Sequence, residues 1–487
     1  MESLLGILAL IAAVIVISAL LSGWVDRTGV PQVAVFLGMG VLIGPIGLGL
    51  LDATVNSPVL RVVATLSLVL VLFTDAVSLD LKEVRAHRLL AALVLGPGTI
   101  LTTILVAAAA WYLLGLSWPL AAILGAAIAS TDPVLLRGIL KRPALHNSVR
   151  QALRLESGLN DVVLLPVVLV GIELLSRATP LTGSDWGRLA INMLLLSPGA
   201  GIVVGMLGVS ALEMVRRRSG VRRDYESLYS LGLAFAAYAA AESFHGSGFI
   251  AAFAAGLTIS AIDVELCDCF LEYGETTAEM ALLFTFVLFG TSIIWGGVAA
   301  ASTATIAFTV VSLVIRPIAF FPALIPAHLS LKNRALIGWF GPRGLSTLLL
   351  VMLPVVKGIE GSDYLLQVSC LVVLVSVLLH GFSPMVLLRA PEAAAPVRPV
   401  RAASLNDGLA LREVPEDRAR PSTITLDEYR ALKDSGRAVV LVDSRTDRTY
   451  DPANPIPDAV RVHPDRAVAD AVRLNLPAAA TLVVFCA

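Results

Sequence analysis

Residues 130–161 read STDPVLLRGILKRPALHNSVRQALRLESGLND, and this stretch decides how the chain is interpreted. It holds two polar clusters, STDP at 130–133 and ESGLND at 156–161, inside long apolar segments. An ionisable side chain is costly at membrane depth and by default marks an ion or proton pathway. Pro133 interrupts the helical hydrogen-bond ladder and frees carbonyl groups beside Asp132. Carboxylate, hydroxyl and carbonyl oxygens that converge here would form a site for a hard monovalent cation.

The composition is that of a polytopic membrane protein. Of 487 residues, 57% are hydrophobic and 15% are charged, and the mean hydropathy is +0.83. These values exclude an ordinary soluble protein, and the net charge of -1 argues against nucleic acid as a partner. Four cysteines are too few for a disulfide framework, and the Cys267–Cys269 pair alone is a weak metal motif. No cofactor is indicated. The first apolar run, 3–22, lacks a basic region before it and is interpreted as a retained span.

Apolar segments of about 17–25 residues are the unit of a membrane-spanning helix. The sequence contains about thirteen of them, at residues 3–22, 31–51, 58–78, 89–114, 118–139, 149–175, 187–215, 226–244, 247–264, 276–295, 298–325, 334–357 and 363–387. Lys and Arg gather in the links after odd-numbered segments, for example Lys82, Arg85 and Arg88. The positive-inside rule therefore predicts an N-terminus outside and a C-terminus in the cytoplasm, in a cell (inner) membrane.

Two of these segments are interrupted. The fifth breaks at 132–133 and the twelfth at 338–344, which reads GWFGPRG. Five and twelve differ by an odd number, so the two segments cross the membrane in opposite directions. This pattern is typical of inverted-repeat secondary transporters, and two unrelated proline kinks are the alternative. We therefore predict an all-α polytopic membrane protein with inverted repeats and two broken crossing helices.

Asp161 is the carboxylate that we expect to exchange ions. A buried carboxylate binds either a proton or a metal ion but not both, and that competition is exchange. Asn160 is neutral, so one proton trades for one monovalent cation and no net charge moves. Ser157 shares a helix face with Asp161 and, like Thr131, supplies a neutral oxygen. We expect Asp132 to ligate the cation directly or through water.

Glu156 is a second carboxylate beside the site and needs a cation of its own. Arg316, just before Pro317, and Arg343, in the break of the twelfth segment, are the two candidates. We favour Arg316 for the ion pair and expect Arg343 to offset the negative ends of the opposed half-helices. The alternative to direct ion binding is that Glu156, Arg316 and Arg343 only hold helices together.

These motifs also carry a family resemblance. STDPV at 130–134, ESGLND at 156–161 and GPRG at 341–344 resemble the sodium/proton antiporters of the monovalent cation:proton antiporter superfamily, in the electroneutral branch with an Asn-Asp pair. The resemblance covers roughly residues 1–388, which we expect to form the transmembrane exchanger domain. It implies a homodimer with a rigid scaffold and a mobile core that carries the ion by an elevator-like movement.

The resemblance further implies a set of cation ligands, namely Thr131, Ser157 and Asp161, with Asp132 close by. The metal would be Na⁺ or K⁺. Gly158 departs from the bulkier residue often found at its position and could widen the site, which leaves the choice between Na⁺ and K⁺ open.

The composition changes after Leu388. Residues 389–420 are rich in Ala, Pro and Arg and predict a flexible linker before a partial α/β domain at 421–487. Within that domain, apolar runs at 439–442 and 482–485 predict buried strands, and 426–433 predicts a helix.

A second resemblance lies in this tail. VDSR at 442–445, PIPDA at 455–459 and VFCA at 484–487 resemble the rhodanese (sulfurtransferase-like) domain, which implies a persulfide-bearing role for Cys486. The sequence stops one residue later, so no loop amides follow to stabilise a thiolate. We expect this segment to be neither catalytic nor stably folded.

Three functions are consistent with these sequence features. The first is an electroneutral exchanger of Na⁺, K⁺ or Li⁺ for H⁺ that serves pH homeostasis, with membrane lipids and a second copy of the chain as partners. The second is a cation channel or non-exchanging permease on the same scaffold. The third is an enzyme, a membrane-tethered sulfurtransferase, although thirteen spans with buried charges are far more than an anchor needs. We favour the exchanger.

Overall fold

The computed structural model describes most of the chain up to residue 387 and parts of the tail. The described residues are 16, 20, 32–45, 47–49, 58–79, 81–140, 142, 145–177, 182–219, 223–262, 283–387, 429–430, 432–433, 439–444, 456, 458–462, 470, 474 and 481–485. The chain divides into two compact units, Met1–Ala393 and Ala394–Ala487.

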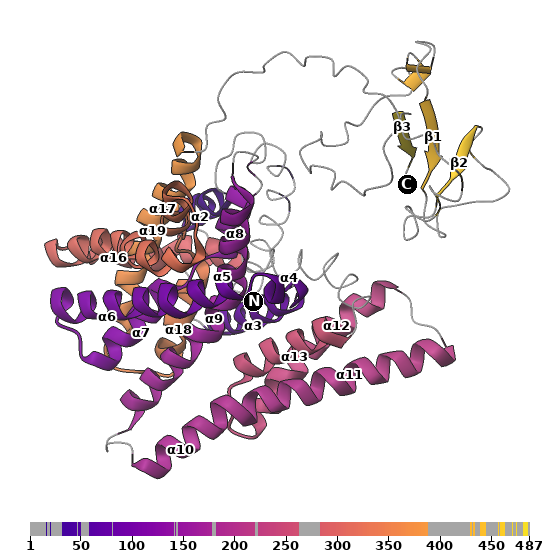
Figure 1. Cartoon of the computed structure of the whole chain (residues 1–487). Helices are drawn as coiled ribbons and strands as arrows, with labels where there is room; N and C mark the ends of the chain where they lie inside the picture. The colour runs from indigo at the N-terminus through magenta and orange to yellow at the C-terminus, as the bar shows by residue number, and fades with distance from the viewer. Residues whose placement is uncertain are drawn as a thin grey trace. The chain divides into compact units, whose positions relative to one another are not determined.

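All the regular secondary structure described in the first unit is helical (Figure 1). Its helices are α2 (Gln32–Ile43), α3 (Pro58–Val77), α4 (Leu81–Ala86), α5 (Arg88–Leu93), η1 (Val94–Ile100), α6 (Leu101–Leu114), α7 (Trp118–Ala129), α8 (Pro133–Leu140), α9 (Asn147–Ser176), α10 (Gly183–Ile191), η2 (Asn192–Leu196), α11 (Ser197–Ser219), α12 (Arg223–Ser243), α13 (Gly248–Ile262), η3 (Phe289–Ile293), α15 (Ile294–Ala299), α16 (Thr303–Ala323), η4 (Ile325–Ala327), α17 (Leu331–Trp339), α18 (Leu345–Val356) and α19 (Ser362–Leu387).

The predicted apolar segments coincide with these helices. Every segment from 31–51 to 363–387 contains a helix, whereas 3–22 lies outside the described residues except for Val16 and Leu20. Within the described part, five helices are long and apolar enough to cross a membrane: 88–114, 147–176, 183–219, 303–323 and 362–384. Four shorter apolar helices are Val62–Val77, Trp118–Ala129, Gly248–Ile262 and Leu345–Val356. The predicted breaks are the reason why two segments appear as pairs of short helices.

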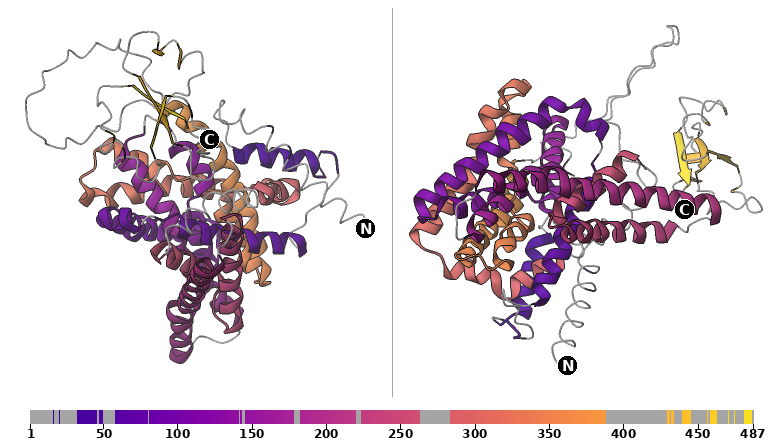
Figure 2. Two further views of the ribbon diagram at one scale, coloured as in Figure 1. Left: turned by 90° about the vertical axis from the view of Figure 1, so that its right-hand side faces the viewer. Right: turned by 90° about the horizontal axis from the view of Figure 1, so that it is seen from below.

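Close helix crossings depend on small residues. α11 and α13 lie side by side, and a Cβ on Gly201 would sit 2.1 Å from the carbonyl oxygen of Ala251 (Figure 1). A Cβ on Gly40 of α2 would likewise lie 2.2 Å from the carbonyl oxygen of Val287. Small residues let apolar helices approach at backbone distance, where dispersion is strongest. α12 packs against both α11 and α13, and Figure 2 shows α11 and α12 running alongside each other.

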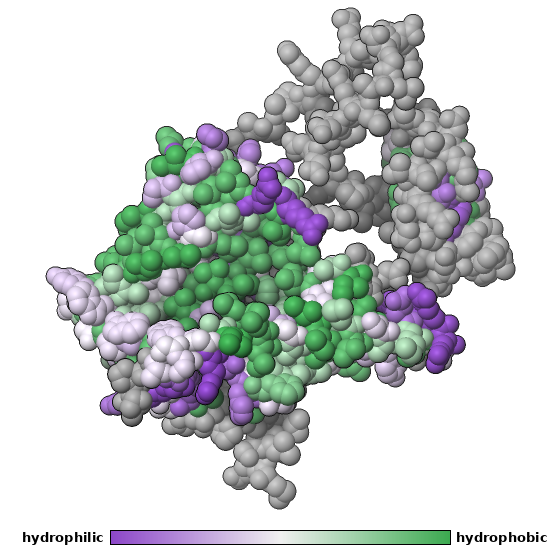
Figure 3. Space-filling view, turned by 60° about the horizontal axis from the view of Figure 1, so that its bottom comes forward, coloured by the Kyte–Doolittle hydropathy of each residue, from purple (hydrophilic) through white to green (hydrophobic). Residues whose placement is uncertain are grey.

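The outer face of the helices is apolar. Large side chains remain exposed on α6, α11 and α16, such as Ile104 at 57%, Leu207 at 65% and Val310 at 56%. Figure 3 shows continuous hydrophobic surface over much of one face of the helical unit. A soluble protein rarely exposes apolar patches of that size, whereas lipid acyl chains cover them without cost.

The described residues of the C-terminal unit form a small parallel sheet. It consists of β1 (Val439–Asp443), β2 (Ala459–Arg461) and β3 (Thr481–Phe485) in the order β2-β1-β3. β1 and β3 lie where the sequence predicted strands. Leu482 and Val484 are nevertheless 49% and 55% exposed, so the prediction that both strands are buried was wrong for β3, since one of its faces is left uncovered. Of the predicted helix 426–433, residues 429–430 and 432–433 are helical, and Cys486 lies outside the described residues.

Candidate ion-binding site

The two broken helices, α7–α8 and α17–α18, meet at their breaks, and this meeting point is called the crossing below. α7 ends at Ala129 and α8 begins at Pro133, while α17 ends at Trp339 and α18 begins at Leu345. The backbone N–H of Asp132 donates to the carbonyl oxygen of Pro342 over 2.9 Å, which ties one break directly to the other. Four helix ends with unsatisfied backbone groups therefore gather at one buried point.

Asp132 accepts hydrogen bonds from the starts of both second half-helices. Its Oδ1 accepts from the N–H of Leu135 in α8 at 3.1 Å, and its Oδ2 accepts from the N–H of Leu345 in α18 at 2.5 Å. A carboxylate at a helix N-terminus is favoured because the free N–H groups and the helix dipole are positive there. Asp132 is 1% exposed, and its charge is offset by two helix ends.

The opposite, negative ends are matched by arginines. Arg343 Nη1 donates to the carbonyl oxygens of Ala129 (2.6 Å) and Ser130 (3.1 Å), where α7 ends. Arg316 does the same for α17: its Nε donates to the carbonyl of Gly338 at 3.0 Å, and its Nη2 donates to that of Ile337 at 2.9 Å. Each arginine thus satisfies carbonyl groups that a membrane interior would otherwise leave unpaired.

Arg316 also forms the ion pair with Glu156. Its Nη1 and Nη2 donate to the two carboxylate oxygens, the second over 2.8 Å, and the side chains are 2% and 1% exposed. Of the two arginines that the sequence offered, Arg316 is therefore the partner. Thr131 Oγ1 adds a donor to Glu156 Oε1 at 2.9 Å. The Thr131 hydroxyl proton is consequently committed to this ion pair rather than to Asp161.

Asp161 has a different environment. It is 6% exposed on α9, and Ser130 Oγ donates to its Oδ1 at 3.0 Å. Among the described residues it has no basic partner. The neighbouring Asn160 Nδ2 donates weakly to the carbonyl of Thr131 at 3.4 Å, and its Oδ1 finds no partner among the described residues. Ser157, 8% exposed, donates only to the carbonyl of Arg154 at 3.3 Å, so its lone pairs remain available.

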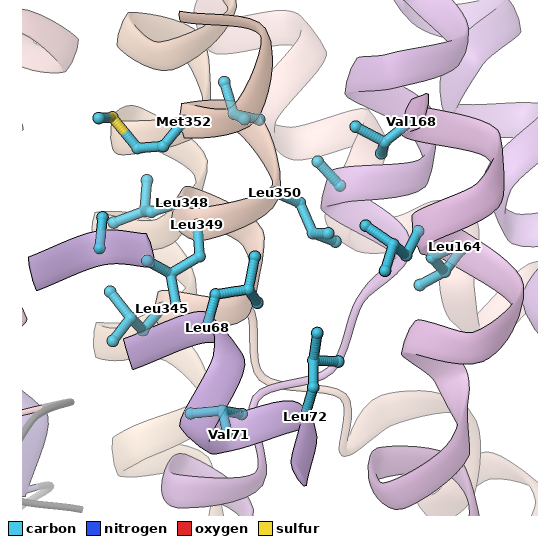
Figure 4. Close-up of a cluster of buried hydrophobic side chains, with 14 of the residues drawn as sticks. Leu68, Val71, Leu72, Leu164, Val168, Leu345, Leu348, Leu349, Leu350 and Met352 are labelled. Carbon is cyan, nitrogen blue, oxygen red and sulfur yellow. The ribbon is translucent and has the colours of Figure 1, made fainter. Parts of the chain in front are cut away.

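A cavity of about 410 Å³ is lined in part by α9 and α18, two helices that also contribute to this site. Leu68 of α3, Leu169 and Glu173 of α9 and Leu349 of α18 are among its lining residues. α3, α9 and α18 also contribute to an apolar cluster, in which Figure 4 shows Leu68, Val71, Leu72, Leu164, Val168, Leu345, Leu348, Leu349, Leu350 and Met352. Leu68, Leu349 and Met352 belong both to this cluster and to the lining of the cavity, so part of the cavity wall is apolar.

Comparison with known proteins identifies the family. The family model described as "Sodium/hydrogen exchanger, transmembrane" matches residues 15–390. The chain belongs to the sodium/hydrogen exchanger family. It is 27% identical over 388 residues to the K(+)/H(+) antiporter NhaP of Alkalimonas amylolytica, across 78% of this chain and 64% of the relative. It is 28% identical over 299 residues to the Na(+)/H(+) antiporter NhaH of Halobacillus dabanensis, across 59% of this chain and 72% of that protein.

The fold of this exchanger family member is also found among solved structures. The sodium proton antiporter MjNhaP1 from Methanocaldococcus jannaschii superposes with a TM-score of 0.66 at 19% identity, covering 80% of this chain and 99% of that one. The present chain spans 64% of the length of the Alkalimonas relative. Fold and family together make it a multi-pass membrane protein.

Ser130 is the site residue that sequence reasoning missed. Ser130 belongs to the STDP motif, but its sequence context predicted no role for it. A hydroxyl directly after the last turn of α7 was the available signal. Its partner Asp161 is 31 residues away in sequence, so the contact becomes visible only in the structure, where α9 packs beside the break after α7.

A glycine provides a stability test of this crossing. A Cβ on Gly344 would lie 2.1 Å from Asp132 Oδ2, which is held by the N–H of Leu345 and cannot move aside. We expect Gly344→Ala to lower the free energy of unfolding by about 1–3 kcal/mol, as overpacking does. Melting of the detergent-purified protein measures it. The matched control is Gly158→Ala, whose Cβ meets only Leu79 Cδ1 at 3.6 Å and which should be neutral or stabilising. Equal melting of both variants would contradict the expectation.

Proposed function

We propose that this chain exchanges a monovalent cation, Na⁺, K⁺ or Li⁺, for H⁺ by alternating access, with Asp161 binding either ion in turn. The observation that carries the proposal is the distribution of charge at the crossing. Glu156 is neutralised by Arg316, and Asp132 faces two helix N-termini. Asp161 alone of the three has no fixed counter-charge among the described residues, although it is buried. A mobile cation or a proton supplies what is missing.

The other predicted ligands complete a site of oxygen donors. Ser157 and the unpartnered Oδ1 of Asn160 offer neutral oxygens beside Asp161. Asp132 lies in the same break with its carboxylate, and the Thr131 hydroxyl keeps one lone pair besides its hydrogen bonds with Glu156 and Arg316. Hard cations prefer such oxygen ligands. The names of the relatives, K(+)/H(+) and Na(+)/H(+) antiporters, support the same ions.

The exchange should be electroneutral because Asn160 carries no charge. Addition of Na⁺ or K⁺ to reconstituted vesicles is expected to move a pH dye while a solid-supported membrane records no sustained current. Asn160→Asp adds a second titratable carboxylate and should make exchange produce current. Current without proton movement in the wild type would instead identify a channel or permease, and current together with proton movement would disprove the electroneutral cycle.

The arrangement in the cell is part of the proposal. The N-terminus would lie outside and the C-terminus in the cytoplasm, as the Lys and Arg pattern predicts. The exchanger domain 1–388 would act as a homodimer among membrane lipids, followed by the linker 389–420 and a rhodanese-like unit at 421–487. The parallel order β2-β1-β3 supports an α/β unit there. Cys486 and any sulfurtransferase activity have no structural support within the described residues.

A further inference from the structure

Ser130 joins the break of one helix to the exchanging carboxylate. The residue follows the last turn of α7 in an extended conformation (φ -63°, ψ 136°) and is fully buried. Its carbonyl oxygen accepts from Arg343 Nη1 at 3.1 Å, which fixes the backbone. Its hydroxyl donates to Asp161 Oδ1 at 3.0 Å. The backbone carbonyl and the side-chain hydroxyl of Ser130 are thus both hydrogen-bonded, and the hydroxyl proton is directed at Asp161.

This hydrogen bond sets how strongly Asp161 attracts a cation. Among the described residues, Ser130 is the one hydrogen-bond donor to Asp161. A donor on a carboxylate oxygen withdraws negative charge from it, and charge-assisted bonds of this kind are the stronger class. A cation that approaches Asp161 therefore meets one oxygen already shared with a proton, and a weaker field than a bare carboxylate would give.

The strength of that field bears differently on small and large cations. A small ion costs more to dehydrate and gains more from a strong, close negative charge, because the attraction rises as the distance falls. A ligand set of weaker field favours the larger, less hydrated ion. On the basis of the exchange function proposed above, we propose that the Ser130 hydroxyl is a specificity-determining group that favours K⁺ over Na⁺ and Li⁺.

The test is a comparison of ion preference at one fixed pH. Wild type, Ser130→Ala and Ser130→Cys are reconstituted, and the apparent KM and maximal rate are measured for K⁺, Na⁺ and Li⁺ with a pH dye. Ser130→Ala is expected to raise the ratio of the KM for K⁺ to the KM for Na⁺ by about five- to tenfold, which is less than the full effect of one charge-assisted hydrogen bond because the ratio registers only the part that differs between the two ions. Ser130→Cys, whose thiol is a weaker donor, should give an intermediate ratio.

A matched control separates this effect from the loss of any buried hydroxyl. Ser369 on α19 is equally buried, and its Oγ has no hydrogen-bond partner among the described residues. Ser369→Ala should leave the KM ratio at the wild-type value. A change of both KM values by the same factor in Ser130→Ala would overturn the proposal, as would a ratio shift in Ser369→Ala of similar size. If Ser130→Ala does not fold, an unchanged ratio in Ser130→Cys overturns it.

Failure of the broader function gives a different result. A wild type that moves no protons with any of the three cations contradicts the exchange function itself. A wild type that exchanges, together with an unchanged KM ratio in the folded Ser130 variants, contradicts only the role of Ser130.

Discussion

Asp161→Asn should abolish cation-driven proton movement in reconstituted vesicles, leaving only the rate of vesicles without protein. The amide keeps the shape of the side chain, and Ser130 can still donate to its oxygen. It cannot release or take up a proton, however, and it brings no charge to attract a cation. Because Asp161 has no basic partner among the described residues, the substitution leaves no buried cation unpaired, and the variant should fold. The measurement is dye response to pulses of Na⁺, K⁺ and Li⁺.

The control for this loss is a carboxylate on the surface of the same protein. Glu213 pairs with Arg217 one helical turn away on α11, and the two side chains are 53% and 77% exposed. Exposed pairs of this kind contribute little to stability, so Glu213→Gln should exchange at a rate close to that of the wild type. Exchange in Asp161→Asn at the rate of Glu213→Gln would show that another group carries the proton.

The sequence predicted the site residues that carry a charge, because a buried charge is costly and therefore conspicuous in an apolar segment. Asp132, Glu156 and Asp161 could be singled out because a carboxylate in an apolar segment demands an explanation. The positions of both breaks followed from Pro133 and from the glycine-rich run at 338–344, and the structure has helix ends at these positions. Local chemistry therefore predicts where a membrane helix stops.

Contacts between the breaks could not be predicted in the same way. The double role of Asp132 depends on Leu345, which is 213 residues further along the chain, and the cap on α7 depends on Arg343. The local sequence around Asp132 or Arg343 does not indicate which helix end the side chain will contact. The Thr131 hydroxyl shows the same limit, since its donation to Glu156 arises only when α9 packs beside the break. The expected ligands remain a prediction, and the sequence could not state how the hydrogen bonds of these residues are shared.

The helices are also less regular than apolar periodicity suggests. Among the described helices, short π-helical segments interrupt three, at η1, η2 and η3. In η1 the cause is visible, because Pro97 lacks an N–H and Thr99 Oγ1 donates to the carbonyl of Val94 at 3.0 Å. A similar cause is present at η2, where Ser197 Oγ donates to the carbonyl of Asn192 at 2.7 Å and Pro198, the next residue, lacks an N–H.

Glu156→Gln should strongly destabilise the protein. It leaves Arg316, 2% exposed, with a full charge and no carboxylate, and breaking a buried pair in this way costs about 3–5 kcal/mol. We expect Arg316→Met to cost at least as much, because the carbonyls of Gly338 and Ile337 also lose their donor. The free energy of unfolding in detergent, or a matching fall in melting temperature, measures both.

The double variant tests whether the two losses share one cause. If the penalty is an unpaired buried charge, Glu156→Gln with Arg316→Met removes both charges and should cost less than the sum of the single variants by about 0.5–3 kcal/mol, the range measured for directly coupled residues. Glu173→Gln gives the scale for an ordinary pair, since Glu173 and Arg177 are 33% and 38% exposed and should contribute below about 1 kcal/mol. Strict additivity in the double variant would mean that Arg316 acts through the α17 carbonyls alone. The ion pair would then have no part in holding the crossing on which Asp161 depends.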